Sequence, residues 1–156
     1  MQKATADKVK AEEEAAAALE KAKPAEENAA TAESAAEDAK KRFEQKDAEV
    51  GGMEEGGAKK TAMVELGNLK AFFTNATANA ATTRQIAEEV KADAADAKKK
   101  AIMAALEEQK VIVTEEGADS MMGMRALQQL TDLENAFQTA EGEVDRARQA
   151  AKEAKA

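Results

Sequence analysis

Residues 58–113 decide the fold, and they read AKKTAMVELGNLKAFFTNATANAATTRQIAEEVKADAADAKKKAIMAALEEQKVIV. Alternating steps of three and four residues along this stretch meet an apolar side chain at every position except Thr83. The positions are Ala62, Leu66, Leu69, Phe73, Ala76, Ala80, Thr83, Ala87, Val90, Ala94, Ala97 and Ala101. A repeat of about 3.5 residues held over several heptads is typical of helices packed knobs-into-holes. The stretch therefore predicts one very long helix with an apolar seam.

The same spacing recurs on both sides of this stretch. The earlier seam is Ala11, Ala15, Ala18, Ala22, Ala25, Ala29, Ala32, Ala36, Ala39 and Phe43, and the later one is Leu130, Leu133, Phe137, Ala140, Val144, Ala147 and Ala151. We expect helices over about 2–50, 58–113 and 119–155, the first two roughly 70 and 80 Å long. The sequence predicts an all-α fold, an elongated antiparallel three-helix bundle or coiled coil with a Gly-rich tip loop, as a single domain over 1–156.

Glycines mark the ends of the helices. Gly51-Gly52 and Gly56-Gly57 bracket a short break, and residues 114–119 form a second one, with Asp119 or Ser120 as the N-cap of the last helix. Pro24 lies inside the first seam, which keeps its register across it. We interpret the first segment as one kinked helix or two collinear ones. The alternative is that a short first helix ends there.

Short connections favour antiparallel neighbours, so the last helix should fold back to bring Ala156 near Ala76. Beyond that point we expect a two-helix tip whose small core consists of Phe43, Val50, Phe72 and Phe73. Four methionines lie near the second break, at Met103, Met121, Met122 and Met124. Methionines can form an adaptable binding surface, but their position favours packing in the core or the turn.

The composition excludes several kinds of chemistry. The chain has no Cys and no His, which rules out thiolate and imidazole metal sites, disulfides and a Ser-His-Asp triad. Net charge is −8, and only four residues are aromatic, all Phe, so a nucleic-acid interface is not expected. We predict that the protein is not an enzyme and that it has no catalytic, cofactor-binding or metal site.

A few motifs have both a functional and a structural interpretation. The acidic run Glu12-Glu13-Glu14 and the lysines Lys98-Lys99-Lys100 suggest cation or anionic-lipid contacts, but solvated helix faces explain both. The tripeptide Asn75-Ala76-Thr77 is an acceptor sequence for N-glycosylation and makes Asn75 the one candidate modification site. Its place within a helix argues against occupancy.

The layout resembles a known group of proteins. Ala accounts for 40 residues and Glu for 23. Two very long predicted helices, exemplified by Ala11 to Phe43 and Asn75 to Ala105, meet at a Gly-rich loop, and a third lies alongside. This resembles the glutamic acid/alanine-rich surface proteins of insect-stage African trypanosomes, and more broadly the extended helical bundles of trypanosome surface glycoproteins. The resemblance implies a GPI-anchored, densely packed coat protein with a glycosylated C-terminal stretch, no catalysis and a role in immune recognition. It carries over no site residues.

We therefore expect a structural cell-surface protein at the extracellular face of the plasma membrane. Its role would be shielding or host interaction. Expected partners are neighbouring coat molecules, with a host or vector macromolecule as a further one. The membrane would be reached only through a lipid anchor outside this chain, which itself carries no targeting segment. We expect a monomer or weak dimer. The alternatives are a surface receptor or adhesin that binds a host ligand, and an intracellular coiled-coil scaffold.

Overall fold

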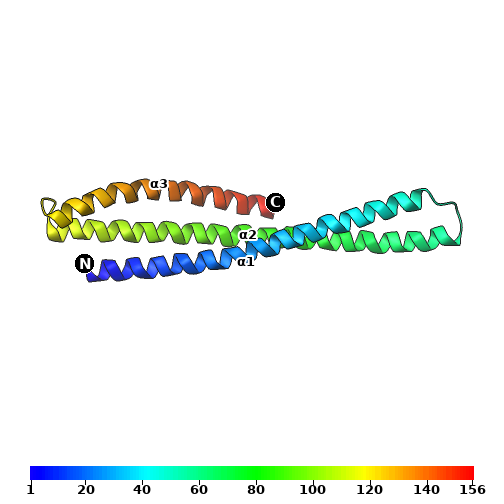
Figure 1. Cartoon of the computed structure of the whole chain (residues 1–156), viewed down its shortest axis with the longest axis horizontal. Coiled ribbons are helices and arrows are strands. Elements are labelled where there is room, and N and C mark those ends of the chain that lie inside the picture. The colour runs from blue at the N-terminus through cyan, green and yellow to red at the C-terminus, as the bar shows by residue number, and fades with distance from the viewer. The chain divides into compact units, whose positions relative to one another are not determined.

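The computed structural model describes residues 1–156 and consists of three helices without strands (Figure 1). They are α1 (Gln2–Gly51), α2 (Gly57–Glu116) and α3 (Met121–Lys155). The predicted all-α class with three helices is confirmed. The expected helix ends lie within three residues of the observed ones.

Helix formation follows from the abundance of Ala, Glu and Lys, which are among the residues with the highest helix propensity. Pro24 does not end α1, which is continuous from Gln2 to Gly51, so the interpretation of Pro24 as a helix end is wrong. At the start of α3, Ser120 is the N-cap, and its Oγ accepts a hydrogen bond from the Gly123 amide at 2.9 Å. This confirms Ser120 as one of the two expected caps.

The chain divides into two compact units, both built from parts of α1 and α2. Unit 1 comprises residues 1–24 and 88–156, and unit 2 comprises residues 25–87. In unit 1 the start of α1, the later half of α2 and all of α3 lie side by side (Figure 1). Unit 2 contains only two helical segments, from α1 and α2, and the loop between them. The expected single domain stays a prediction.

The core consists almost entirely of alanine. All but two of the buried apolar residues are Ala, and the exceptions are Val50 and Val144. Every position of the three predicted seams is buried or half-buried, and none is exposed. Because an Ala side chain is a single methyl group, helices that meet at such seams can approach to about 8 Å or less. The burial per residue is small, so stability depends on the length of the contact.

Unit 2 has a small aromatic contact near its loop. The rings of Phe43 and Phe73 stack with their centroids 6.1 Å apart, and Val50 is buried. Phe72, however, is 56% exposed, so its predicted place in this core is wrong. Adjacent residues of a helix point about 100° apart. With a single neighbouring helix in the unit, Phe73 can be covered while Phe72 remains in solvent.

In unit 1 the turn between α2 and α3 is tight. Gly117 has a left-handed backbone (φ 85°), and its amide donates to the Val113 carbonyl, which closes the end of α2. Gly123 is buried directly against this turn. The far end of α3 lies opposite Glu89, because Lys155 Nζ is 2.9 Å from a Glu89 carboxylate oxygen. The expected approach of Ala156 to Ala76 is therefore wrong by several turns of α2.

Candidate interaction surfaces

Ion pairs connect the helices of unit 1, most of them across solvent-facing edges. Lys8 Nζ lies 3.1 Å from Glu108 Oε1, and the amino terminus lies 3.0 Å from Glu115 Oε1. Between α2 and α3 the pairs are Lys98–Glu143, Lys99–Glu141, Asp96–Arg148 and Glu89–Lys155. The exposed pairs each contribute roughly 0–1 kcal/mol. Lys8–Glu108 is more buried, because the Glu108 side chain is only 9% exposed. The main effect of these pairs is to favour one register of the helices over its neighbours.

In unit 2 a single arginine connects α2 to two carboxylates of α1. Arg84 Nη1 donates to both Glu26 oxygens, at 2.8 and 3.0 Å, while Nε and Nη2 contact Glu33. Towards the loop, Lys46 Nζ lies 2.8 Å from Glu65 Oε2. These carboxylates raise the pKa of Arg84, mainly through Glu26, and the pKa of Lys46, mainly through Glu65. A group whose pKa is raised on folding stabilises the folded state fully at pH values below its ordinary pKa. This stabilisation is lost only as pH rises through the raised pKa, so both contacts contribute fully at neutral pH.

The Arg84 contact yields a first prediction. We expect Arg84→Gln to lower the free energy of unfolding by about 1 kcal/mol, because two charged contacts across the α1–α2 interface are lost. The loss should shrink in about 1 M NaCl, where charges are screened within a few ångströms. Chemical denaturation followed by circular dichroism measures it. The matched control is Lys23→Gln, which removes an exposed pair within α1 to Glu20 and should change little. Equal losses in both variants would contradict this role of Arg84.

Four large apolar side chains are exposed in the first two turns of α3, directly after the α2–α3 turn. The expectation that the methionines pack in the core or turn is wrong, since Met103, Met121, Met122 and Met124 are all half or more exposed. Leu127, one turn further along α3, is 42% exposed. Several exposed apolar side chains within two helical turns favour an interaction surface, and the flexible thioether side chain adapts to different partners.

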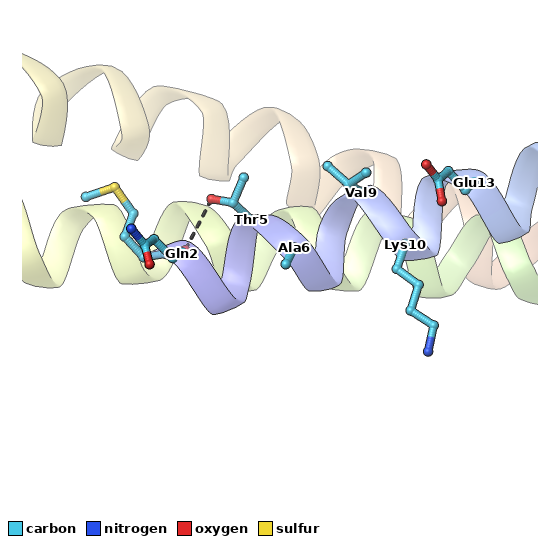
Figure 2. A pocket seen from close by; sticks show the side chains of 7 residues that line it. Gln2, Thr5, Ala6, Val9, Lys10 and Glu13 are labelled. Atoms are coloured by element: carbon cyan, nitrogen blue, oxygen red, sulfur yellow. Dashed lines mark hydrogen bonds between the residues drawn. The ribbon is translucent and has the colours of Figure 1, made fainter.

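Unit 1 also has shallow hollows on its surface. One has a volume of about 550 Å³, but it is lined only by Met1 and by six residues from the first turns of α1, between Gln2 and Glu13. Figure 2 shows these side chains along one helix. The Thr5 hydroxyl donates a hydrogen bond to the Met1 carbonyl oxygen, and Lys10 extends away from Val9. A hollow bounded by one helix cannot enclose a ligand, so it is an open face of α1 and no binding pocket.

A second hollow has walls from more than one helix. It has a volume of about 400 Å³ and runs over alanines of α1 and α2, with Leu19, Lys91, Lys98 and Glu143 at its edges. Leu19 is 56% exposed. The two lysines have carboxylate partners, Glu88 and Glu143 respectively. The small size of Ala creates this groove, and its floor is apolar.

The remaining sequence candidates lie on exposed helix faces. Asn75 is exposed on α2, and the Thr77 hydroxyl of its acceptor sequence donates to the Phe73 carbonyl at 2.9 Å. The acidic residues Glu12, Glu13 and Glu14 are exposed, and no group of three or more acidic side chains converges in a way that could hold a metal ion. Glycosylation of Asn75 and the absence of cofactors stay predictions.

None of the three helices combines the length and apolar character needed to span a bilayer. Comparison with known proteins gives no assignment, since no family model, curated protein or solved structure matches the chain.

Proposed function

We propose that the chain is a non-catalytic structural surface protein, the helical ectodomain of a GPI-anchored coat molecule like those of insect-stage trypanosomes. The observation that carries the proposal is the alanine core. Long helices meet through buried Ala at nearly every core position, while charged pairs occupy their edges. Its role is to shield the membrane or meet host molecules.

The proposal includes an antiparallel coiled-coil arrangement of neighbouring helices within each unit. Three observations support it. In unit 1, Met1 pairs with Glu115 and Lys8 with Glu108, so residue numbers fall along α2 as they rise along α1. In unit 2, Glu33 pairs with Arg84 and Lys46 with Glu65, in the same sense. The pairs Glu89–Lys155, Asp96–Arg148 and Lys98–Glu143 repeat the pattern between α2 and α3.

The physical mechanism follows from side-chain size and charge. Alanine seams bring helix axes close together and keep each unit thin, which allows many copies per area of membrane. The net charge of −8 opposes aggregation of neighbouring copies, because like charges repel at distances within the screening length. A coat needs both properties: close spacing and no precipitation.

The test uses living cells of the source organism. We expect phosphatidylinositol-specific phospholipase C to release the protein into the supernatant, where an antibody against this chain detects it. A cytosolic enzyme of the same cells is the control and should remain in the pellet. Surface trypsin treatment before lysis should remove the signal. Copy number per cell then separates a coat, with very many molecules, from a receptor with few.

Two outcomes would contradict the proposal in different ways. Retention on cells with trypsin sensitivity would indicate a surface protein with another anchor. Retention within cells that resist trypsin would exclude the surface location and favour an intracellular coiled-coil scaffold.

A receptor or adhesin is the second candidate function. The exposed apolar side chains at the start of α3 favour it, because a coat that only shields has no use for them; they belong to Met121, Met122, Met124 and Leu127. A low copy number together with release by the phospholipase would support the receptor over the coat.

A further inference from the structure

One stretch of α2 differs from the rest of the chain in its charge. Residues 71–83, AFFTNATANAATT, contain no acidic or basic side chain, although 35% of all residues are charged. Lys70 and Arg84 border the stretch. It lies in unit 2, where α1 is the other helix.

Most of this stretch faces solvent. Four residues of the stretch are buried or half-buried and form its part of the seam towards α1: Phe73, Ala76, Ala80 and Thr83. The other nine residues are exposed: Ala71, Phe72, Thr74, Asn75, Thr77, Ala78, Asn79, Ala81 and Thr82. An exposed helix surface in an Ala/Glu/Lys-rich protein normally carries charge for solubility. This face lacks such charges over about three turns.

The threonines of the stretch make this face less polar than its sequence suggests. Thr74, Thr77 and Thr82 each donate a hydroxyl hydrogen bond to the backbone carbonyl four residues earlier, at 2.9, 2.9 and 3.0 Å. Their donors are satisfied inside the helix. Covering these side chains therefore costs less than covering a hydroxyl that has to give up water.

The exposed residues also follow a second heptad spacing. Alternating steps of four and three residues connect Asn68, Phe72, Asn75, Asn79, Thr82 and Ile86, all of which are exposed. This line lies one residue before the seam that faces α1. Phe72 is 56% and Ile86 49% exposed. Large apolar residues with Asn at seam positions are typical of helices that pair in one register, because an Asn opposite an apolar side chain would lose its hydrogen bonds.

We propose that this line, the Asn68–Ile86 seam, is the contact through which two copies of this chain associate. The charge of the chain and the lack of charge on the seam favour a second copy as the partner. Two molecules with a net charge of −8 each repel, and they approach most easily where neither presents a charge. A partner recognised by its own charge would find no complementary group on this seam. The inference concerns the chain itself and does not depend on the proposed surface location.

The seam is short, which sets the strength of the association. Residues 68–86 rise about 29 Å along the helix axis. One helix face of that length provides less than the roughly 800 Å² per partner that a stable complex buries. The dimer should therefore be weak and reversible, formed when copies are concentrated side by side.

Sedimentation equilibrium of the recombinant full chain tests the proposal. We expect a monomer–dimer equilibrium that strengthens with added NaCl, because salt screens the repulsion between copies while the seam itself is uncharged. Asn79→Glu places a charge on the seam of both copies and should weaken association about tenfold or more. The matched control is Asn28→Glu, which adds the same charge at an exposed position of the other helix of this unit, α1.

Cysteine cross-linking locates the contact independently, since the chain has no native Cys. Asn75→Cys or Asn79→Cys should give disulfide-linked dimers under mild oxidation far faster than Asn28→Cys. The proposal would be overturned by a monomer at all concentrations, or by equal effects of the Asn79 and Asn28 variants in both experiments. A glycan on Asn75 of protein purified from its source would also overturn it, because a glycan there would cover the seam.

Discussion

Replacing Gly123 with alanine is expected to lower the free energy of unfolding by about 2–4 kcal/mol. A Cβ atom at this position would lie 1.7 Å from the Gly117 carbonyl oxygen and 2.7 Å from its carbonyl carbon. Both are backbone atoms, so no side-chain rotation relieves the overlap. Gly117 itself is held in a left-handed conformation that ends α2, and the cap from Ser120 to the Gly123 amide depends on the same approach.

Gly142→Ala is the matched control on the same helix. A Cβ there would meet only the Arg146 guanidinium, at 3.9 Å, which can move. The change should raise the free energy of unfolding by about 0.5–1 kcal/mol, since alanine favours the helix over glycine. Urea unfolding followed by circular dichroism distinguishes the two variants by sign. If Gly123→Ala were as stable as the wild-type protein, α3 would not approach the turn as described.

The helices and their inward faces could be predicted from the sequence, for a clear physical reason. A helix shows the same face every three to four residues, so an apolar seam such as Ala62 to Ala101 identifies the buried side without knowledge of the partner. Glycine pairs at 51–52 and 56–57 and the N-cap at Ser120 end and start helices by local chemistry alone. None of these signals depends on contacts far away in the chain.

The wrong predictions of side-chain burial depended on how many neighbouring helices cover each helix. Both Phe72 and Phe73 are apolar, and the sequence does not say that only one helix face is covered in unit 2. Met121 and Met122 were expected to be covered for the same reason, although a thin bundle cannot cover consecutive residues that point in different directions. The end of α3 opposite Glu89 likewise depends on the turn geometry, which residues 114–120 do not encode as a motif.

The candidate sites could be predicted less well than the fold. Asn75 is recognisable as an acceptor tripeptide, but its exposure follows only from the arrangement of α1 and α2 in unit 2. The charge-free stretch 71–83 is visible in the sequence. Its meaning, however, requires knowing that nine of its residues face solvent and that its threonines bond to their own helix. For a line of mixed polar and apolar residues such as Asn68 to Ile86, heptad spacing alone does not distinguish an inner seam from an outer one.

The alanine core itself gives the second large effect. We expect Ala29→Leu to lower the free energy of unfolding by about 2–3 kcal/mol, because Ala29 is fully buried and the closely packed interior has no room for three more carbon atoms. The helices of unit 2 would have to separate locally, which would also disturb the contacts of Glu26 and Glu33 with Arg84 nearby on α1.

Ala30→Leu provides the control, because Ala30 is the next residue of α1 and is exposed. Leu and Ala have similar helix propensities, so this variant should stay within about 0.5 kcal/mol of the wild-type protein. Thermal and urea unfolding of both variants measure the difference. If leucine were tolerated equally at both positions, the helices would not be in close contact at Ala29. The thin alanine-packed unit on which the proposed coat function depends would then lose its physical basis. If only Ala29→Leu lowers the free energy of unfolding, the alanine content of the sequence is directly connected to the close spacing of the helices.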